Sequence, residues 1–103
     1  MIYEHRTYHI LPGKMPEFTE TFGNMLVPLF EKYGAKLIGV WQTVIGQNDE
    51  FTYILGFDGL ANQEKFWRNF RQDEQYKKYR QGAPPVSYVV SKILQPTPYS
   101  SLK

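Results

Sequence analysis

The sequence predicts one α+β domain of the ferredoxin-like βαββαβ type, an antiparallel four-stranded sheet with helices on one face. The chain has 103 residues, which is the usual size of a single domain. Its expected elements follow the order strand, helix, strand, strand, helix, strand. Aromatic side chains make up 17% of the residues, and they need a core or an interface to cover them. We place the domain at residues 1–95 and expect residues 96–103, which contain two prolines, to form an extended tail.

The first half of the chain predicts a strand, a helix and a hairpin. Residues 2–11 alternate and are rich in Tyr, Ile and Thr, which is typical of a strand. Residues 16–33 carry apolar side chains three or four positions apart, which predicts a helix with a kink at Pro28. Residues 37–45 and 51–57 indicate two further strands. The short polar link between them contains glycine and favours an antiparallel hairpin.

The second half predicts two helices and a last strand. Residues 60–70 have a helical pattern of aromatic side chains, and residues 73–80 form a second short helix that begins at an aspartate cap. Tyr76 and Tyr79 fall on one face of that second helix. Residues 86–94 then complete the sheet.

Helices on one side of this sheet leave its other face uncovered. Alternation along the first strand puts bulky side chains on both faces, with Tyr3, His5, Thr7 and His9 on one and Glu4, Arg6, Tyr8 and Ile10 on the other. A bare sheet face this aromatic exceeds the apolar patch that a monomer tolerates. We therefore expect a symmetric homodimer.

Composition excludes several classes of protein. Twelve basic against ten acidic residues argue for solubility and against a polyanion as the main partner. The chain has no cysteine, so it has no disulfide scaffold, thiolate metal site or cysteine nucleophile. No apolar run approaches the ~20 residues of a membrane span. The first residues lack the features of a signal or transit peptide, and we expect a cytoplasmic protein.

Motifs for nucleic acids, phosphates and serine hydrolysis are missing from the sequence. RNA-recognition domains share this strand order, but residues 48–53 are acidic where their third strand needs a basic residue. The sequence has no Gly-x-Ser-x-Gly elbow and no glycine-rich phosphate loop. We therefore expect no nucleic-acid partner.

A series of short runs, in order and over nearly the whole chain, resembles the NIPSNAP family. The runs are residues 3–8, 12–14, 28–34, 39–41, 57–61, 73–76 and 93–96. The resemblance implies a dimeric α/β barrel, in which two ferredoxin-like sheets face each other. Groups that share this barrel include cofactor-free monooxygenases, lactone isomerases and haem-handling enzymes, so function follows only weakly from the fold. His5, Tyr53 and Leu55 depart from the family pattern, and no catalytic residue is carried over.

Glu4, Arg6 and Tyr8 are the first candidate site residues. Alternation places them on one face of the first strand, and the family resemblance suggests that this is the barrel side. A charged pair in a covered strand is costly unless it is satisfied. Two interpretations stay open. The pair is structural and is closed by the Tyr8 hydroxyl, or Arg6 is presented to a carbonyl or carboxylate ligand with Tyr8 as a second donor.

The remaining candidates are aromatic or basic. The aromatic side chains that would line a cavity, or fill the core, are Trp41, Tyr53, Phe57 and Trp67. His5 and His9 lie on one strand about 13 Å apart and cannot share a zinc ion, so we expect no metal and no cofactor. The basic side chains of residues 65–80 predict a solvated helix face.

Two functional classes fit the sequence. One is a protein that binds a small organic molecule inside a dimeric barrel, with a cofactor-free monooxygenase or isomerase as its sharpest form. The other is a non-catalytic protein-interaction module. The sequence does not decide whether the chain is an enzyme.

Overall fold

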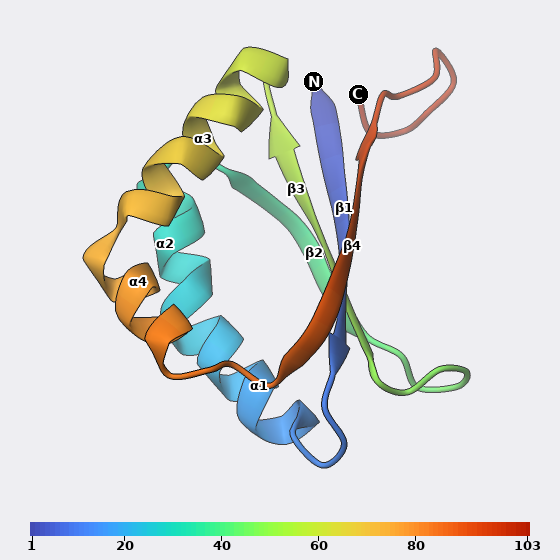
Figure 1. The fold of residues 1–103 in the computed structure, drawn as a ribbon. Coiled ribbons are helices and arrows are strands. Elements are labelled where there is room, and N and C mark those ends of the chain that lie inside the picture. Colours follow the sequence, from blue (N-terminus) through green and yellow to red (C-terminus); the bar gives the residue numbers. More distant parts are fainter.

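Four antiparallel strands form the sheet of the computed structural model, which describes residues 1–103 (Figure 1). They are β1 (Ile2–Ile10), β2 (Lys36–Gln42), β3 (Glu50–Phe57) and β4 (Val86–Leu94). Their order across the sheet is β2-β3-β1-β4, the ferredoxin-like arrangement that the sequence predicts. β1 pairs with β3 on one side and with β4 on the other, so its side chains have cross-strand neighbours on both sides.

The helices lie together on one side of the sheet (Figure 1). The first helical segment runs through α1 (Met15–Thr21), the π-helical stretch η1 (Phe22–Leu26) and α2 (Val27–Lys32). The predicted distortion at Pro28 takes the form of this π-helical stretch, in which the Val27 amide donates to the Phe22 carbonyl five residues back. A wider turn lets the backbone adjust just before a proline, which has no amide proton to give.

The second pair of helices is α3 (Leu60–Gln72) and α4 (Glu74–Gln81). Asp73 caps α4 as predicted, because its Oδ1 accepts from the amides of Gln75 (2.9 Å) and Tyr76 (3.1 Å). None of the helices is both long and apolar enough to cross a membrane.

The aromatic core lies between the sheet and the helix layer. Alternate residues of β3 point toward the helices, namely Phe51, Tyr53, Leu55 and Phe57. They meet aromatic rings from both helical segments, namely Phe22, Phe30 and Phe66, and Phe70 packs against Phe30 and Phe66. The high aromatic content therefore fills this core first.

The opposite face of the sheet carries no helix (Figure 1). Two segments next to the sheet, the β2–β3 link and the C-terminal residues, differ from the predicted structure. β2 ends at Gln42, earlier than the sequence predicts, and Val44 and Ile45 stand 90% and 94% exposed in the link to β3. Residues 95–103 leave the sheet at its end. They do not run straight, because the Ser100 amide donates to the Thr97 carbonyl and closes a turn.

Candidate functional site

The carboxylate of Glu4, on β1, is the centre of a polar cluster beneath the helices. Its Oε1 accepts from Gln63 Nε2 (3.0 Å) and Trp67 Nε1 (2.6 Å), both on α3. Its Oε2 accepts from Ser91 Oγ (2.8 Å) on β4 and from Arg6 (2.9 Å). Burial by itself raises the pKa of Glu4, but the four donors outweigh it and hold the pKa below its ordinary value. Glu4 is therefore a fully satisfied buried anion.

These contacts correct the predicted placement of the cluster. The sequence analysis put Glu4, Arg6 and Tyr8 on the side that would face a second sheet, and this was wrong. Trp67 of α3 donates to Glu4, so the cluster lies on the helix-covered face of its own sheet. Alternation shows that the three residues share a face, but it does not show which face the helices cover.

Arg6 is the cation of the cluster, and not all of its N–H donors have a partner. Its Nε donates to Tyr53 Oη (2.8 Å), one terminal nitrogen to Glu4 (2.9 Å) and the other, more weakly, to Tyr8 Oη (3.4 Å). The Trp67 ring lies 4.4 Å from the guanidinium carbon in a cation–π contact. A guanidinium has five N–H donors, so donors remain on both terminal nitrogens. The side chain is 17% exposed, which leaves those donors within reach of a ligand.

The charge of Arg6 is fixed by its surroundings. Burial alone lowers the pKa of an arginine, but the phenols of Tyr53 and Tyr8 and the carboxylate of Glu4 outweigh it and raise the pKa of Arg6 further. The guanidinium stays positive at any pH at which the protein is folded.

Two tyrosine hydroxyls, those of Tyr53 and Tyr8, share a hydrogen bond beside Arg6. Burial raises the pKa of Tyr53 well above its ordinary value, as does the neighbouring Tyr8, so Tyr53 remains a neutral phenol with a proton to donate. Its oxygen accepts from Arg6, and its hydroxyl lies 2.8 Å from that of Tyr8. Either hydroxyl can be the donor of this bond, so Arg6, Tyr53 and Tyr8 form one connected hydrogen-bond network.

Two hollows open beside this cluster. One, of about 170 Å³, is polar and is lined by Glu4, Arg6, Gln63, Trp67, Arg71 and Tyr76; we call it the polar hollow. The other, of about 60 Å³, is mostly apolar, and we call it the inner hollow. Its lining includes Arg6, Tyr8, Phe70, Tyr76, Tyr79 and Val89. Arg6 and Tyr76 border both, so the unused donors of Arg6 face space that a ligand can fill.

The other predicted site residues divide between core and surface. Tyr53 and Trp67 belong to the cluster, whereas Phe57 is packed in the core. Trp41 is 52% exposed on the uncovered face, because a β-bulge between Leu37 and Gly39 shifts the register of β2. At the edge of the sheet it also borders a separate hollow of about 360 Å³ with Phe22 and Val27. A regular strand would have turned Trp41 toward the helices with Leu37.

His9 lies on the uncovered face, away from the cluster. Its Nδ1 lies 3.0 Å from Asp49 Oδ2, and its ring stacks on Tyr88 with centroids 4.0 Å apart. Both contacts hold the ring in place, which is typical of a structural histidine.

Several residues of the cluster and of the two hollows were not predicted from the sequence. Tyr76 and Tyr79 were predicted to share one helix face but were not predicted as site residues. Two tyrosines on one face of a short basic helix are a pattern that could have indicated a site. Ser91 and Gln63 reach Glu4 from 87 and 59 residues away, and no local pattern indicates such contacts. Arg71 and Arg80 belong to the predicted solvated face, and each also borders a hollow.

Comparisons with known proteins agree on the fold. The NIPSNAP family model matches residues 3–101. A structure of an uncharacterized NIPSNAP domain protein from Burkholderia xenovorans is 24% identical, covers 97% of this chain and 98% of its own, and has a TM-score of 0.87. A protein from Agrobacterium tumefaciens is 21% identical over the full length of both chains, with a TM-score of 0.92.

A more distant structure extends the likeness beyond that family. A protein assigned as an antibiotic biosynthesis monooxygenase, from Bordetella bronchiseptica, is 19% identical, covers 93% of this chain and 96% of its own, and has a TM-score of 0.69. At these identities the structural likeness shows a shared fold. No curated protein sequence matches the chain.

Proposed function

Because this chain belongs to the NIPSNAP family, whose fold alone does not define an activity, we propose a function from its own site. The chain binds a small organic molecule that carries a carboxylate or carbonyl oxygen. The ligand lies between the helix layer and strands β1 and β4, and the oxygen lies against Arg6 and Tyr8.

The observation that carries the proposal is the pattern of donors around Arg6. Glu4 neutralises the cation and fixes its position, yet N–H donors remain on both terminal nitrogens beside two hollows. The Tyr8 hydroxyl, on the same strand face, is a second group that can donate or accept a hydrogen bond. Donors that are held in place before a ligand arrives bind an oxygen with little ordering cost.

The surrounding charges favour an anion over a neutral ligand. Arg71 borders the polar hollow and Arg80 borders the inner one, and neither forms an ion pair within the chain. Two unpaired guanidinium groups at the rim attract negative charge. A carboxylate is therefore the first choice for the polar end of the ligand.

A reaction on a bound carbonyl is the catalytic form of this proposal. Donors fixed on a carbonyl oxygen stabilise the negative charge that develops there when an enolate forms. The Bordetella bronchiseptica protein with the same fold is described as a monooxygenase, which favours oxidation over isomerisation: with dissolved molecular oxygen as the oxidant, the CH₂ group beside the carbonyl becomes a second C=O and the other oxygen atom leaves as water with the two hydrogens.

We also propose that the chain acts as a homodimer. The apolar side chains on the uncovered face include Trp41, Ile54, Tyr88, Val90 and Leu94, of which four are exposed. A second copy would cover this face through a sheet-to-sheet contact, and we expect it to bury more than ~1,000 Å².

A protein-interaction module is the second candidate function. It is favoured by Val44 and Ile45, two aliphatic side chains that stand almost fully exposed in the β2–β3 link. If this candidate is right, replacing both with serine abolishes binding of a partner protein and leaves small-ligand binding unchanged.

Titration calorimetry with 4-phenylbutanoate as the probe tests the main proposal. We expect saturable binding that Arg6→Met weakens by about 10- to 100-fold, the value of one or two charge-assisted hydrogen bonds. Arg68→Met is the matched control, because Arg68 is an exposed arginine on α3 that borders neither hollow. Equal affinities in both variants would contradict the proposal.

A further inference from the structure

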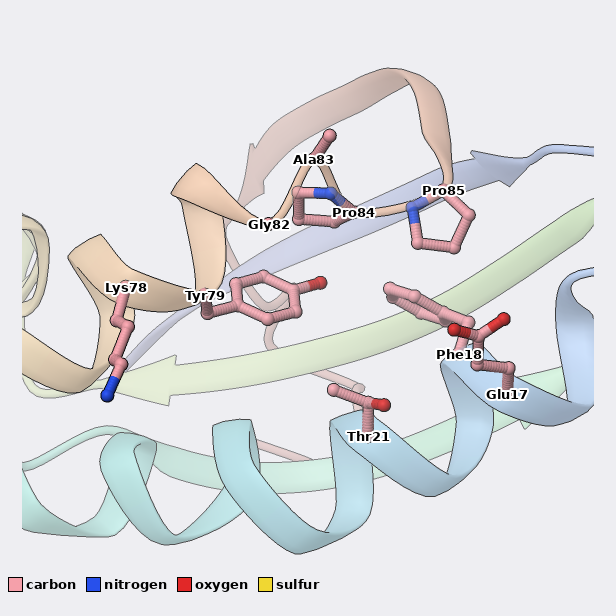
Figure 2. Close-up of a pocket in the computed structure, with 9 residues that line it drawn as sticks. All are labelled: Glu17, Phe18, Thr21, Lys78, Tyr79, Gly82, Ala83, Pro84 and Pro85. Carbon is pink, nitrogen blue, oxygen red and sulfur yellow. The ribbon is translucent and has the colours of Figure 1, made fainter.

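A third cavity lies on the surface between α1 and the loop that joins α4 to β4 (Figure 2). It has a volume of about 240 Å³, and we call it the outer pocket. Its lining residues are Glu17, Phe18, Thr21, Lys78, Tyr79, Gly82, Ala83, Pro84 and Pro85. None of them takes part in the polar cluster around Glu4 and Arg6.

The outer pocket and the inner hollow share a wall. Tyr79 and Pro84 line both cavities, so one side chain and one loop residue separate the surface from the space beside Arg6. Figure 2 shows the Tyr79 ring reaching from α4 across the pocket toward Phe18. Removing or turning that ring would join the two cavities.

Pro84 and Tyr79, the two residues of this wall, differ in how freely they can move. Pro84 follows Ala83, whose φ of 52° lies in the left-handed region that residues other than glycine rarely adopt, and Pro85 comes next. A loop with two consecutive prolines and a strained residue is stiff, and such strain is often kept at functional sites. The Tyr79 hydroxyl, by contrast, forms no hydrogen bond within the chain. Its ring rests on Tyr76 with centroids 6.1 Å apart, so it can turn without losing a polar contact.

The volumes of the two cavities indicate that an organic ligand would occupy both. The inner hollow, at about 60 Å³, accepts a carboxylate or a carbonyl group but little more. The outer pocket, at about 240 Å³, has an apolar wall formed by Phe18, Pro84 and Pro85. Joined, the two volumes reach the lower end of the ~300–1,000 Å³ that is typical of small-molecule sites.

We propose that the outer pocket is the second compartment of the ligand site, and that Tyr79 is the movable partition that sets how long a ligand the site accepts. The ligand is an elongated organic acid. Its carboxylate lies at Arg6, and its apolar remainder passes Tyr79 into the outer pocket. This inference rests on the proposed function, because it takes Arg6 as the anchor.

A series of aryl carboxylates of increasing length tests the partition. Benzoate can place its carboxylate at Arg6 and its ring in the polar hollow of about 170 Å³, whereas 6-phenylhexanoate is too long for the two hollows and has to pass Tyr79. We expect Tyr79→Ala to strengthen binding of 6-phenylhexanoate about 10-fold, because the ring no longer has to move, and to leave benzoate within about 2-fold. Tyr79→Phe is the matched control, since it keeps the ring and should bind both acids as the parent chain does.

A chemical block of the outer pocket gives a second readout that does not depend on removing Tyr79. The chain has no cysteine, so Thr21→Cys introduces a single thiol on the wall of the outer pocket. Labelling it with a bulky maleimide should weaken 6-phenylhexanoate at least about 10-fold and spare benzoate. The unlabelled variant and a labelled Thr97→Cys variant, which carries the label in the tail, should bind both acids normally.

The outcomes separate the two proposals. If Arg6→Met abolishes binding of both acids but neither Tyr79→Ala nor the Thr21 label changes the dependence on length, the partition is refuted and the Arg6 site stands. If binding of benzoate does not depend on Arg6, the proposed function fails and this inference fails with it.

Discussion

Each face of the sheet departs locally from the usual arrangement of polar and apolar side chains, although the covered face still holds the aromatic core. β1 sends Glu4, Arg6 and Tyr8 to the face that the helices cover, and there they form a satisfied polar cluster. Across β2 and β4, the uncovered face presents exposed side chains such as Trp41 and Val90. Ordinarily the covered face of an antiparallel sheet is apolar and the exposed face is polar.

Each departure has its own meaning. Charges placed under helices cost free energy, so a cluster of them indicates either a structural network or a site. Apolar rings left in solvent indicate that something covers them. On this account the covered face binds a ligand and the uncovered face binds a second copy of the chain.

The largest expected effect is on the free energy of unfolding, and it distinguishes Glu4 from Arg6 in the cluster on the covered face. Glu4→Leu removes the only acceptor shared by four donors and leaves the guanidinium of Arg6 without its counter-ion. We expect it to lower the free energy of unfolding by about 3–5 kcal/mol. Arg6→Met leaves Glu4 with three donors, and we expect a loss of only about 1–2 kcal/mol.

Urea unfolding of both variants and of the double variant measures this difference. Equal, severe losses in the two single variants, with strong coupling between them, would show that the pair is a structural brace. Arg6 would then not be available to a ligand.

The second prediction concerns dimerisation through the uncovered face. Val90 pairs with Thr7 and is 50% exposed on that face, whereas its neighbour Val89 pairs with Tyr8 and points toward the hollows. In a symmetric sheet-to-sheet dimer, Val90→Asp buries a carboxylate in each copy. We expect it to weaken dimerisation at least about 100-fold.

Val89→Asp is the matched control on the same strand. Sedimentation of the two variants should give a monomer for Val90→Asp and a dimer for Val89→Asp. A parent chain that sediments as a monomer at micromolar concentration would remove the homodimer from the account.

A smaller effect concerns the cap of α4, the helix that carries Tyr76 and Tyr79. Asp73 accepts from two amides of α4, and its Oδ2 accepts from Tyr33 Oη (2.5 Å) on the first helical segment. We expect Asp73→Ala to cost about 1–2 kcal/mol of unfolding free energy. Tyr33→Phe keeps the cap and should cost about 1 kcal/mol or less. If the two variants lose the same amount, the cap contributes nothing beyond the tyrosine contact.

The smallest effect is acid sensitivity. The pKa of Glu4 is lowered from 4.5 and that of Asp73 from 3.8, so both groups bind protons less readily in the folded chain than in the unfolded one. Their contribution to stability is therefore complete above those ordinary values and is lost as the pH falls through the lowered ones. Unfolding free energies measured from pH 7 to pH 3 should decline below about pH 4.5. The decline should be shallower in the Glu4→Gln variant, and an unchanged slope would argue against Glu4 as a contributor.

The sequence predicted the fold well because its signals are local. Alternation, helical spacing and the Asp73 cap act within a few residues, and β4 was placed at its observed bounds. The family resemblance was confirmed by the match over residues 3–101. The end of β2 was set too late because Val44 and Ile45 favour strands but have nothing to pack against.

The site was predicted only in part, because it depends on contacts between distant segments. Glu4, Arg6 and Tyr8 were grouped correctly, but on the wrong side, since the side is decided by where α3 lies. The sequence did not predict that Trp41 would be half exposed, because a single β-bulge, which no propensity signals, changes the face on which it lies. The wall that Tyr79 and Pro84 form between the inner hollow and the outer pocket could not be predicted, because it depends on how α4 packs against the sheet.

The central claim is that the helix-covered face takes the ligand, and the two tryptophans of the chain test it directly. Trp67 lies in the covered cluster and Trp41 on the uncovered face, so their indole N–H resonances report one face each. With ¹⁵N-labelled protein, a titration with 4-phenylbutanoate should shift the Trp67 resonance to saturation and leave that of Trp41 in place. In the Arg6→Met variant the Trp67 resonance should move only at about 10- to 100-fold higher ligand concentration, and that of Trp41 should again stay in place. A Trp67 resonance that does not respond in the parent chain, or that responds equally without Arg6, would contradict the account.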